Sequence, residues 1–195
     1  MREDDEKRAS SFELVVVGAS WGGLRALKCV LAGLPDNFPA ALVVAQHRAT
    51  DSSDVMVRLL QNHSRMSVIE ASDKDVIEPG NVYIAPPDYH LLVEPGSLAL
   101  SIEEEVHHSR PSIDVVFESA ADAYADRLVG VILTGANDDG SAGLKRIRDA
   151  GGVTVVQDPA TAERREMPEA AIAAVKGAKV LPLRKIASFL VEVCR

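Results

Sequence analysis

Short runs of apolar, often β-branched residues recur along the chain without the polar alternation of a half-exposed strand. Such runs are typical of strands buried on both faces, as in parallel sheets. Segments with helical spacing of apolar residues lie between them. This alternation predicts an α/β fold: a doubly wound, mostly parallel sheet with helices on both faces. The predicted strands are 13–17, 41–46, 67–70, 82–85, 129–134, 153–157 and 179–182, and the clearest helices are 112–125, 141–150 and one from about residue 184.

One stretch, residues 89–102, departs from this alternation. Two short apolar runs flank Glu94-Pro95-Gly96-Ser97, which predicts one antiparallel β-hairpin beside the main sheet. A length of 195 residues suits a single core. We therefore expect a charged flexible tail at residues 1–11 and a single domain at residues 12–195.

Charge and composition exclude several classes of protein. The chain has 21 Lys and Arg against 29 Asp and Glu, a net charge of −8, which disfavours binding to nucleic acid. No apolar run approaches the roughly 20 residues of a membrane helix, and the charged N-terminus is unlike a signal peptide. Two cysteines are too few for a zinc cluster or a disulfide scaffold. We expect a cytoplasmic protein with no metal or cofactor and no membrane insertion.

Three chemically useful groups follow separate predicted strands. Ser20 follows the first strand, His47 the second, and Asp138 and Asp139 follow the strand at 129–134. Because ligands bind beyond the carboxyl ends of the strands in open α/β sheets, we expect these groups to share one edge. A hydroxyl, an imidazole and a carboxylate are the components of a hydrolytic triad.

The turn around Ser20 has three interpretations. Gly18-x-Ser20-x-Gly22 fits a nucleophile elbow, in which a serine occupies a sharp strand-to-helix turn and the Trp21 N–H donates to an oxyanion. The second interpretation is a dinucleotide-binding loop. That loop would require glycine at position 20 and an acidic residue at the place of Gln46-His47. A purely structural turn is the third.

The other polar residues also have ordinary structural interpretations. His47 could simply end a strand, and either aspartate, or Ser141, could cap the helix that starts near Ser141. Two adjacent aspartates could also bind magnesium, but no further carboxylate is evidently placed to complete such a site. The remaining histidines lie in expected loops or element edges without metal-binding spacing; they are His63, His90, His107 and His108.

Several separated motifs, in order, resemble the catalytic domain of chemotaxis protein-glutamate methylesterases of the CheB type. The similarity runs from about residue 13 to the C-terminus. The motifs are Gly18-Ala19-Ser20-x-Gly22-Gly23, Gln46-His47, Leu133-Thr134-Gly135-x-x-x-Asp139-Gly140-x-x-Gly143, Pro79-Gly80 with Val82-Tyr83-Ile84-Ala85-Pro86, His90, Arg110-Pro111-Ser112-Ile113-Asp114-Val115 and Met167-Pro168.

The resemblance implies hydrolysis of γ-glutamyl methyl esters on the cytoplasmic region of chemoreceptors, with release of methanol. Some members also deamidate receptor glutamines. The motifs imply that Ser20 is the nucleophile, His47 the general base and Asp139, directly before Gly140, the orienting acid. The implied partner is a methylated chemoreceptor or a related signalling protein. A non-catalytic or repurposed binding module of the same fold is the alternative, and a nucleotide-binding Rossmann-like domain is a more distant one.

Three features depart from the family pattern. Trp21 stands where family members carry threonine, so its indole is expected to narrow the cleft. Ala136-Asn137-Asp138 stands where a Met-Gly-Asn type of sequence is usual; this loop is expected to supply a second oxyanion donor near Ala136. Only about 12 residues precede the first strand, so no receiver domain is expected. Control would then come from a separate response-regulator partner, or the site would be constitutively open, unless the chain is a fragment.

Overall fold

A computed structural model describes residues 12–47, 53–106 and 108–195; the charged tail predicted at residues 1–11 lies outside them. Seven parallel strands form the central sheet, in the order β3-β4-β2-β1-β7-β8-β9. The apolar runs of the five inner strands are buried on both sides, as the sequence predicted, whereas the edge strands β3 and β9 are partly exposed. The strands are β1 (Leu14–Ala19), β2 (Ala41–Gln46), β3 (Ser67–Glu70), β4 (Asn81–Ile84), β7 (Leu128–Ile132), β8 (Val153–Gln157) and β9 (Lys179–Leu181).

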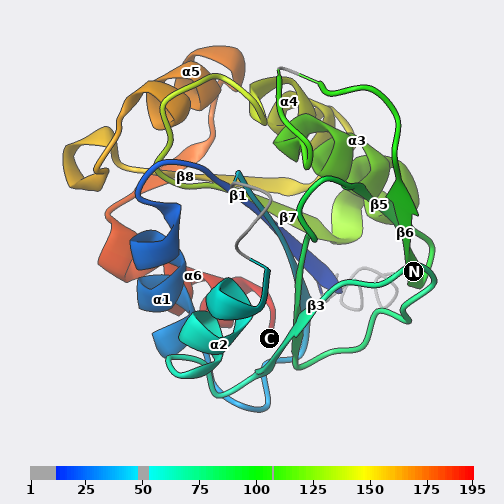
Figure 1. Ribbon diagram of the computed structural model, residues 1–195. Coiled ribbons are helices and arrows are strands. Elements are labelled where there is room, and N and C mark those ends of the chain that lie inside the picture. The colour runs from blue at the N-terminus through cyan, green and yellow to red at the C-terminus, as the bar shows by residue number, and fades with distance from the viewer. Residues whose placement is uncertain (1–11, 48–52, 107) are drawn as a thin grey trace, which may run out of the picture.

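Helices cover both faces of this sheet, which confirms the doubly wound prediction (Figure 1). One hydrophobic core lies under α1, α2 and α6, and a second lies under α3, α4 and α5. The amphipathic helices bury one apolar stripe each against the sheet. Their bounds are α1 (Gly23–Ala32), α2 (Ser53–Gln61), α3 (Ile113–Tyr124), α4 (Ser141–Asp149), α5 (Glu166–Ala174) and α6 (Leu183–Val193).

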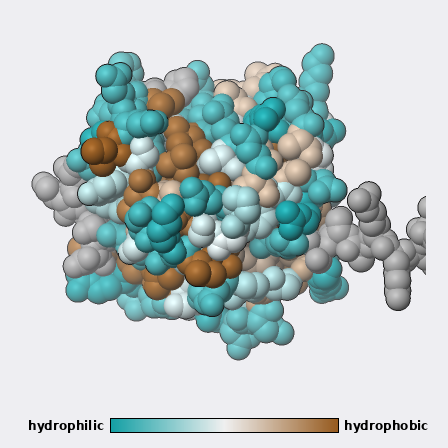
Figure 2. Space-filling view, turned by 90° about the vertical axis from the view of Figure 1, so that its right-hand side faces the viewer, coloured by the Kyte–Doolittle hydropathy of each residue, from teal (hydrophilic) through white to brown (hydrophobic). Residues whose placement is uncertain are grey.

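The predicted hairpin is present as β5 (His90–Glu94) and β6 (Ser97–Ser101), an antiparallel pair that forms its own two-stranded sheet. It packs on α3 through buried residues such as Leu91 and Val93. On the face shown in Figure 2, hydrophobic and hydrophilic side chains are interspersed. Within the described ranges, no helix is both long enough and apolar enough to span a bilayer.

The sheet order places a topological switch point between β1 and β7. From β1 the chain runs outward to β2 and later returns to β7 on the opposite side of β1. The loops that follow these two strands therefore diverge to opposite faces and leave a crevice at the carboxyl edge, where ligands bind in such folds. Ser20 and Asp139 lie in these two loops.

Candidate active site

A sharp turn presents Ser20 at the end of β1. The Ser20 N–H donates to the Thr134 carbonyl at 3.0 Å, and the Gly23 N–H donates to the Ser20 carbonyl at 2.9 Å. Gly22 has a φ of 79°, and a Cβ there would also collide with Glu163. Glycine favours this conformation, and with Gly22 as its N-cap α1 begins only three residues after Ser20.

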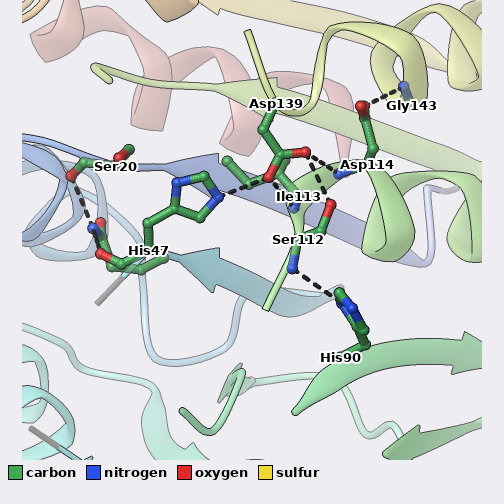
Figure 3. Close-up of polar contacts among 9 residues, drawn as sticks. Ser20, His47, His90, Ser112, Ile113, Asp114, Asp139 and Gly143 are labelled. Atoms are coloured by element: carbon green, nitrogen blue, oxygen red, sulfur yellow. Dashed lines mark hydrogen bonds and ion pairs between the residues drawn. The ribbon is translucent and has the colours of Figure 1, made fainter. Parts of the chain in front are cut away.

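Gln46 ties this turn to His47. Its side-chain Nε2 donates to the carbonyls of both Ser20 and His47, each at 2.8 Å. The His47 N–H donates to the Ala19 carbonyl at 3.1 Å. These contacts fix the imidazole beside the serine turn (Figure 3). In the sequence Gln46 stands out only as part of the Gln46-His47 motif, and these hydrogen bonds give it a positioning role.

Asp139 is fully buried and accepts four hydrogen bonds (Figure 3). Oδ2 accepts from His47 Nε2 at 2.7 Å and from the Ile113 N–H at 2.7 Å. Oδ1 accepts from the Asp114 N–H at 2.9 Å and from Ser112 Oγ at 3.0 Å. The carboxylate thus satisfies free N–H groups at the N-terminus of α3, where the helix dipole also favours a negative charge.

These contacts determine the charge of Asp139. Burial alone would raise its pKa, but the hydrogen bonds from His47 and from the N–H groups of Ile113 and Asp114 outweigh it. The pKa of Asp139 is therefore held below its ordinary value. Asp139 remains an anion that can orient and stabilise an imidazolium.

The two nitrogens of the His47 imidazole face different residues. Because Nε2 faces Asp139, Nδ1 lies on the side of Ser20 (Figure 3). In the common serine-protease arrangement the two nitrogens have the opposite roles. A proton on Nε2, donated to Asp139, leaves the Nδ1 lone pair free to accept the Ser20 proton. Within the described part of the chain the Ser20 hydroxyl makes no hydrogen bond; such contacts tighten when substrate binds.

The two adjacent aspartates occupy different environments. Asp138 is exposed, and its backbone carbonyl accepts from the Ser141 N–H. Gly140 is the N-cap of α4, without a side-chain capping bond. The interpretation of Asp138, Asp139 or Ser141 as a side-chain cap of α4 is therefore wrong. Asp139 instead caps α3, which is remote in sequence.

Ser112 and His90 form a second hydroxyl and imidazole pair around Asp139. The Ser112 N–H donates to His90 Nδ1 at 3.3 Å, and His90 Nε2 donates to the Glu104 carbonyl at 2.9 Å. Ser112 is fully buried and its hydroxyl donates a hydrogen bond to Asp139, and His90 is 2% exposed. Because both side chains are buried, this pair supports the Asp139 carboxylate from the interior of the domain and does not reach the surface. In the sequence, the only sign of this pair was that His90 and the Arg110-Pro111-Ser112 motif are both part of the family resemblance.

Two backbone groups are suited to bind an oxyanion. Among the described residues, none accepts a hydrogen bond from the N–H of Trp21 or of Ala136. Trp21 directly follows Ser20, and Ala136 is exposed in the loop after β7. Both residues thus lie in the loops that flank the switch point, and these are the positions at which the sequence predicts oxyanion donors.

A cavity of about 460 Å³ lies behind the serine turn. Gly22 and Thr134 line it, but Ser20, His47 and Asp139 do not. It therefore adjoins the reacting groups without containing them. No group of three or more potential metal ligands occurs among the residues that the structure describes.

The fold and the carboxyl edge of its sheet define a class: a doubly wound α/β domain that brings a serine, a histidine and an aspartate together from three strand ends. The family model described as CheB methylesterase matches residues 15–190. A solved structure of the Thermotoga maritima CheB methylesterase catalytic domain aligns with a TM-score of 0.88 and 34% identity, covering 94% of this chain and 99% of that chain. The chain belongs to the CheB methylesterase family and is an enzyme of the protein-glutamate methylesterase class.

Curated relatives differ in how much of their length this chain spans. A putative protein-glutamate methylesterase/protein-glutamine glutaminase of Leptospira interrogans is 46% identical over 93% of this chain and 95% of its own length. A protein-glutamate methylesterase/protein-glutamine glutaminase of Anaeromyxobacter dehalogenans is 42% identical over 100% of this chain but 57% of its own length. The methylesterase FrzG of Myxococcus xanthus is 38% identical over 97% of this chain and 58% of its own length.

Proposed function

We propose that Ser20, His47 and Asp139 hydrolyse γ-glutamyl methyl esters in the cytoplasmic region of chemoreceptors. The observation that carries this proposal is the 2.7 Å contact between His47 Nε2 and a buried Asp139, beside a serine in a sharp strand-to-helix turn. The geometry supplies a nucleophile, a base and an orienting acid at the edge where α/β folds bind ligands.

The reaction follows from these positions. Ser20 Oγ attacks the ester carbonyl while His47 Nδ1 takes the hydroxyl proton, and Asp139 stabilises the imidazolium. The N–H groups of Trp21 and Ala136 bind the oxyanion. The tetrahedral intermediate collapses, methanol leaves with the proton from His47, and water then hydrolyses the acyl-enzyme to glutamate. Methoxide is a better leaving group than an amide nitrogen, so esters should react faster than glutamine side chains.

The substrate, partner and location are parts of this proposal. The relatives' names assign them protein-glutamate methylesterase and protein-glutamine glutaminase activities. A methylated chemoreceptor in the cytoplasm would present the glutamyl ester. A separate response regulator is the proposed partner for control of this domain.

Replacement of Ser20 by alanine tests the nucleophile. We expect methanol release from methylated chemoreceptor membranes to fall by on the order of 10³-fold or more, because only binding and oxyanion contacts remain. Methanol is measured by its release from a labelled methyl group. Full methanol release by Ser20→Ala would refute the assignment.

A fluorophosphonate probe separates an enzyme from a binding module of the same fold. The probe should label Ser20 in the wild-type chain and should fail to label Ser20→Ala. It should label His47→Ala far more slowly, because the serine would have lost its base. An absence of labelling in wild-type protein that binds chemoreceptor would favour the binding module.

A further inference from the structure

The side chain of Trp21 is held in place although it is exposed. Its indole N–H donates to Glu163 Oε1 at 3.1 Å, and the Arg164 guanidinium lies over the ring, 5.4 Å from its centroid. The residue is still 59% exposed. An aromatic surface thus stands next to the nucleophile, in a defined orientation and open to solvent.

The backbone of Arg164 connects the two loops that flank Ser20. Its N–H donates to Thr134 Oγ1 at 2.8 Å, and the same hydroxyl lies 2.9 Å from the Trp21 carbonyl. The Arg164 carbonyl accepts from the Gly135 N–H at 3.3 Å. Thr134 is 1% exposed, so this junction is part of the core. Arg164 is therefore anchored beside both proposed oxyanion donors.

The guanidinium of Arg164 is only weakly engaged. Its one ion pair among the described residues is with Glu166, at 3.9 Å between Nη1 and Oε1. The neighbouring Arg165, by contrast, contacts Glu169 at 3.1 Å one helical turn along α5. The Arg164 side chain is 49% exposed. Its donors are available to another carboxylate.

We propose that Trp21 and Arg164 form a subsite that binds a carboxylate of the substrate polypeptide, next to the glutamyl ester that Ser20 attacks. The inference rests on the proposed function and adds a determinant of substrate choice. Arginine presents a planar fork of N–H groups that matches a carboxylate, and the indole holds that fork in position. Because this chain has a net charge of −8, it repels an acidic polypeptide overall, so that binding of such a substrate requires a local positive charge.

Replacement of Arg164 by glutamine tests the subsite. The substrates are two methylated peptides, one with acidic residues beside the ester and one with glutamines in their place. For the acidic peptide we expect KM to rise by about 2- to 5-fold, the range of exposed ion pairs, with the change in KM and not in kcat. The preference for the acidic peptide over the neutral one should fall by the same factor.

Arg165→Gln is the matched control, because it removes an adjacent positive charge that already pairs with Glu169 of α5. It should leave KM for both peptides unchanged. The Trp21→Ala, Arg164→Gln double variant should weaken binding of the acidic peptide no more than the more severe single variant, since both residues build one subsite. Independent, additive losses would contradict the proposal.

The outcomes distinguish this inference from the proposed function. If wild-type protein neither releases methanol nor reacts with the fluorophosphonate, the proposed function fails. If wild-type protein is active but Arg164→Gln and Arg165→Gln have equal effects, or Arg164→Gln affects both peptides equally, the subsite is refuted and the methylesterase assignment stands.

Discussion

Burial separates the two adjacent aspartates that follow β7. Asp139 is fully buried and hydrogen-bonded to His47, whereas Asp138 is exposed. Two carboxylates that are adjacent in the sequence therefore lie in different environments. Of the two, only Asp139 contacts the imidazole of His47.

Amide substitutions at these two positions should have very different effects. Asp139→Asn should lower kcat for methyl ester hydrolysis by on the order of 10³- to 10⁴-fold, because an amide cannot stabilise the imidazolium and can favour the wrong tautomer. Asp138→Asn should change kcat by about twofold or less, as is usual for an exposed side chain. Steady-state methanol release measures both, and the reverse order would show that the orienting acid is Asp138.

At the scale of elements, the site depends on the contact between α3 and α4. The N-terminus of α3 supplies three of the four hydrogen bonds to Asp139. Asp114, also in α3, accepts from the Gly143 N–H of α4 at 2.7 Å. A Cβ at Gly143 would lie 2.5 Å from the Phe117 Cβ and 3.1 Å from the Asp114 carbonyl oxygen. Glycine is thus required for the close approach of the two helices.

Gly143→Ala should force these helices apart. Alanine gains about 1 kcal/mol in helix propensity, but overpacking against Phe117 costs roughly 1–3 kcal/mol, so we expect net destabilisation in urea unfolding. Activity should also fall, because displacement of α3 disturbs the bonds to Asp139. The exposed Ala142→Ser is the control, with an expected loss of about 0.5 kcal/mol or less. Unchanged stability in Gly143→Ala would show that the helices can move freely.

At the scale of the whole molecule, the ionised Asp139 links the stability of the fold to pH. Its pKa in the folded protein lies below the ordinary value of 3.8, so the folded state favours the charged form. This stabilisation is complete above the unfolded-state pKa and is lost as pH falls through the lower folded-state pKa.

Comparison of wild type with Asp139→Asn in urea unfolding across pH isolates this contribution. At neutral pH the variant should be less stable by roughly 1–3 kcal/mol, because buried donors lose a charged acceptor. The difference should shrink as pH falls through the folded-state pKa of Asp139. A difference that stays constant down to the most acidic pH would mean that this carboxylate has the same pKa in both states.

The sequence alone was sufficient for the strands, the hairpin and three of the helices (α3, α4 and α6), because buried parallel strands and amphipathic helices leave periodic apolar patterns in the chain. The bounds of α1, α2 and α5 came only from the structure. The sequence also predicted that Ser20, His47 and the aspartate pair share the carboxyl edge of the sheet, since parallel strands end together. The family motif already selected Asp139 by its place directly before Gly140. Only the tertiary structure showed that Asp139 is buried while Asp138 is exposed, and that Nε2 of His47 faces Asp139. Those distinctions depend on burial and on hydrogen bonds between residues that lie far apart along the chain, such as Asp139 with the N-terminus of α3 and Trp21 with Glu163, and no local pattern encodes such pairings.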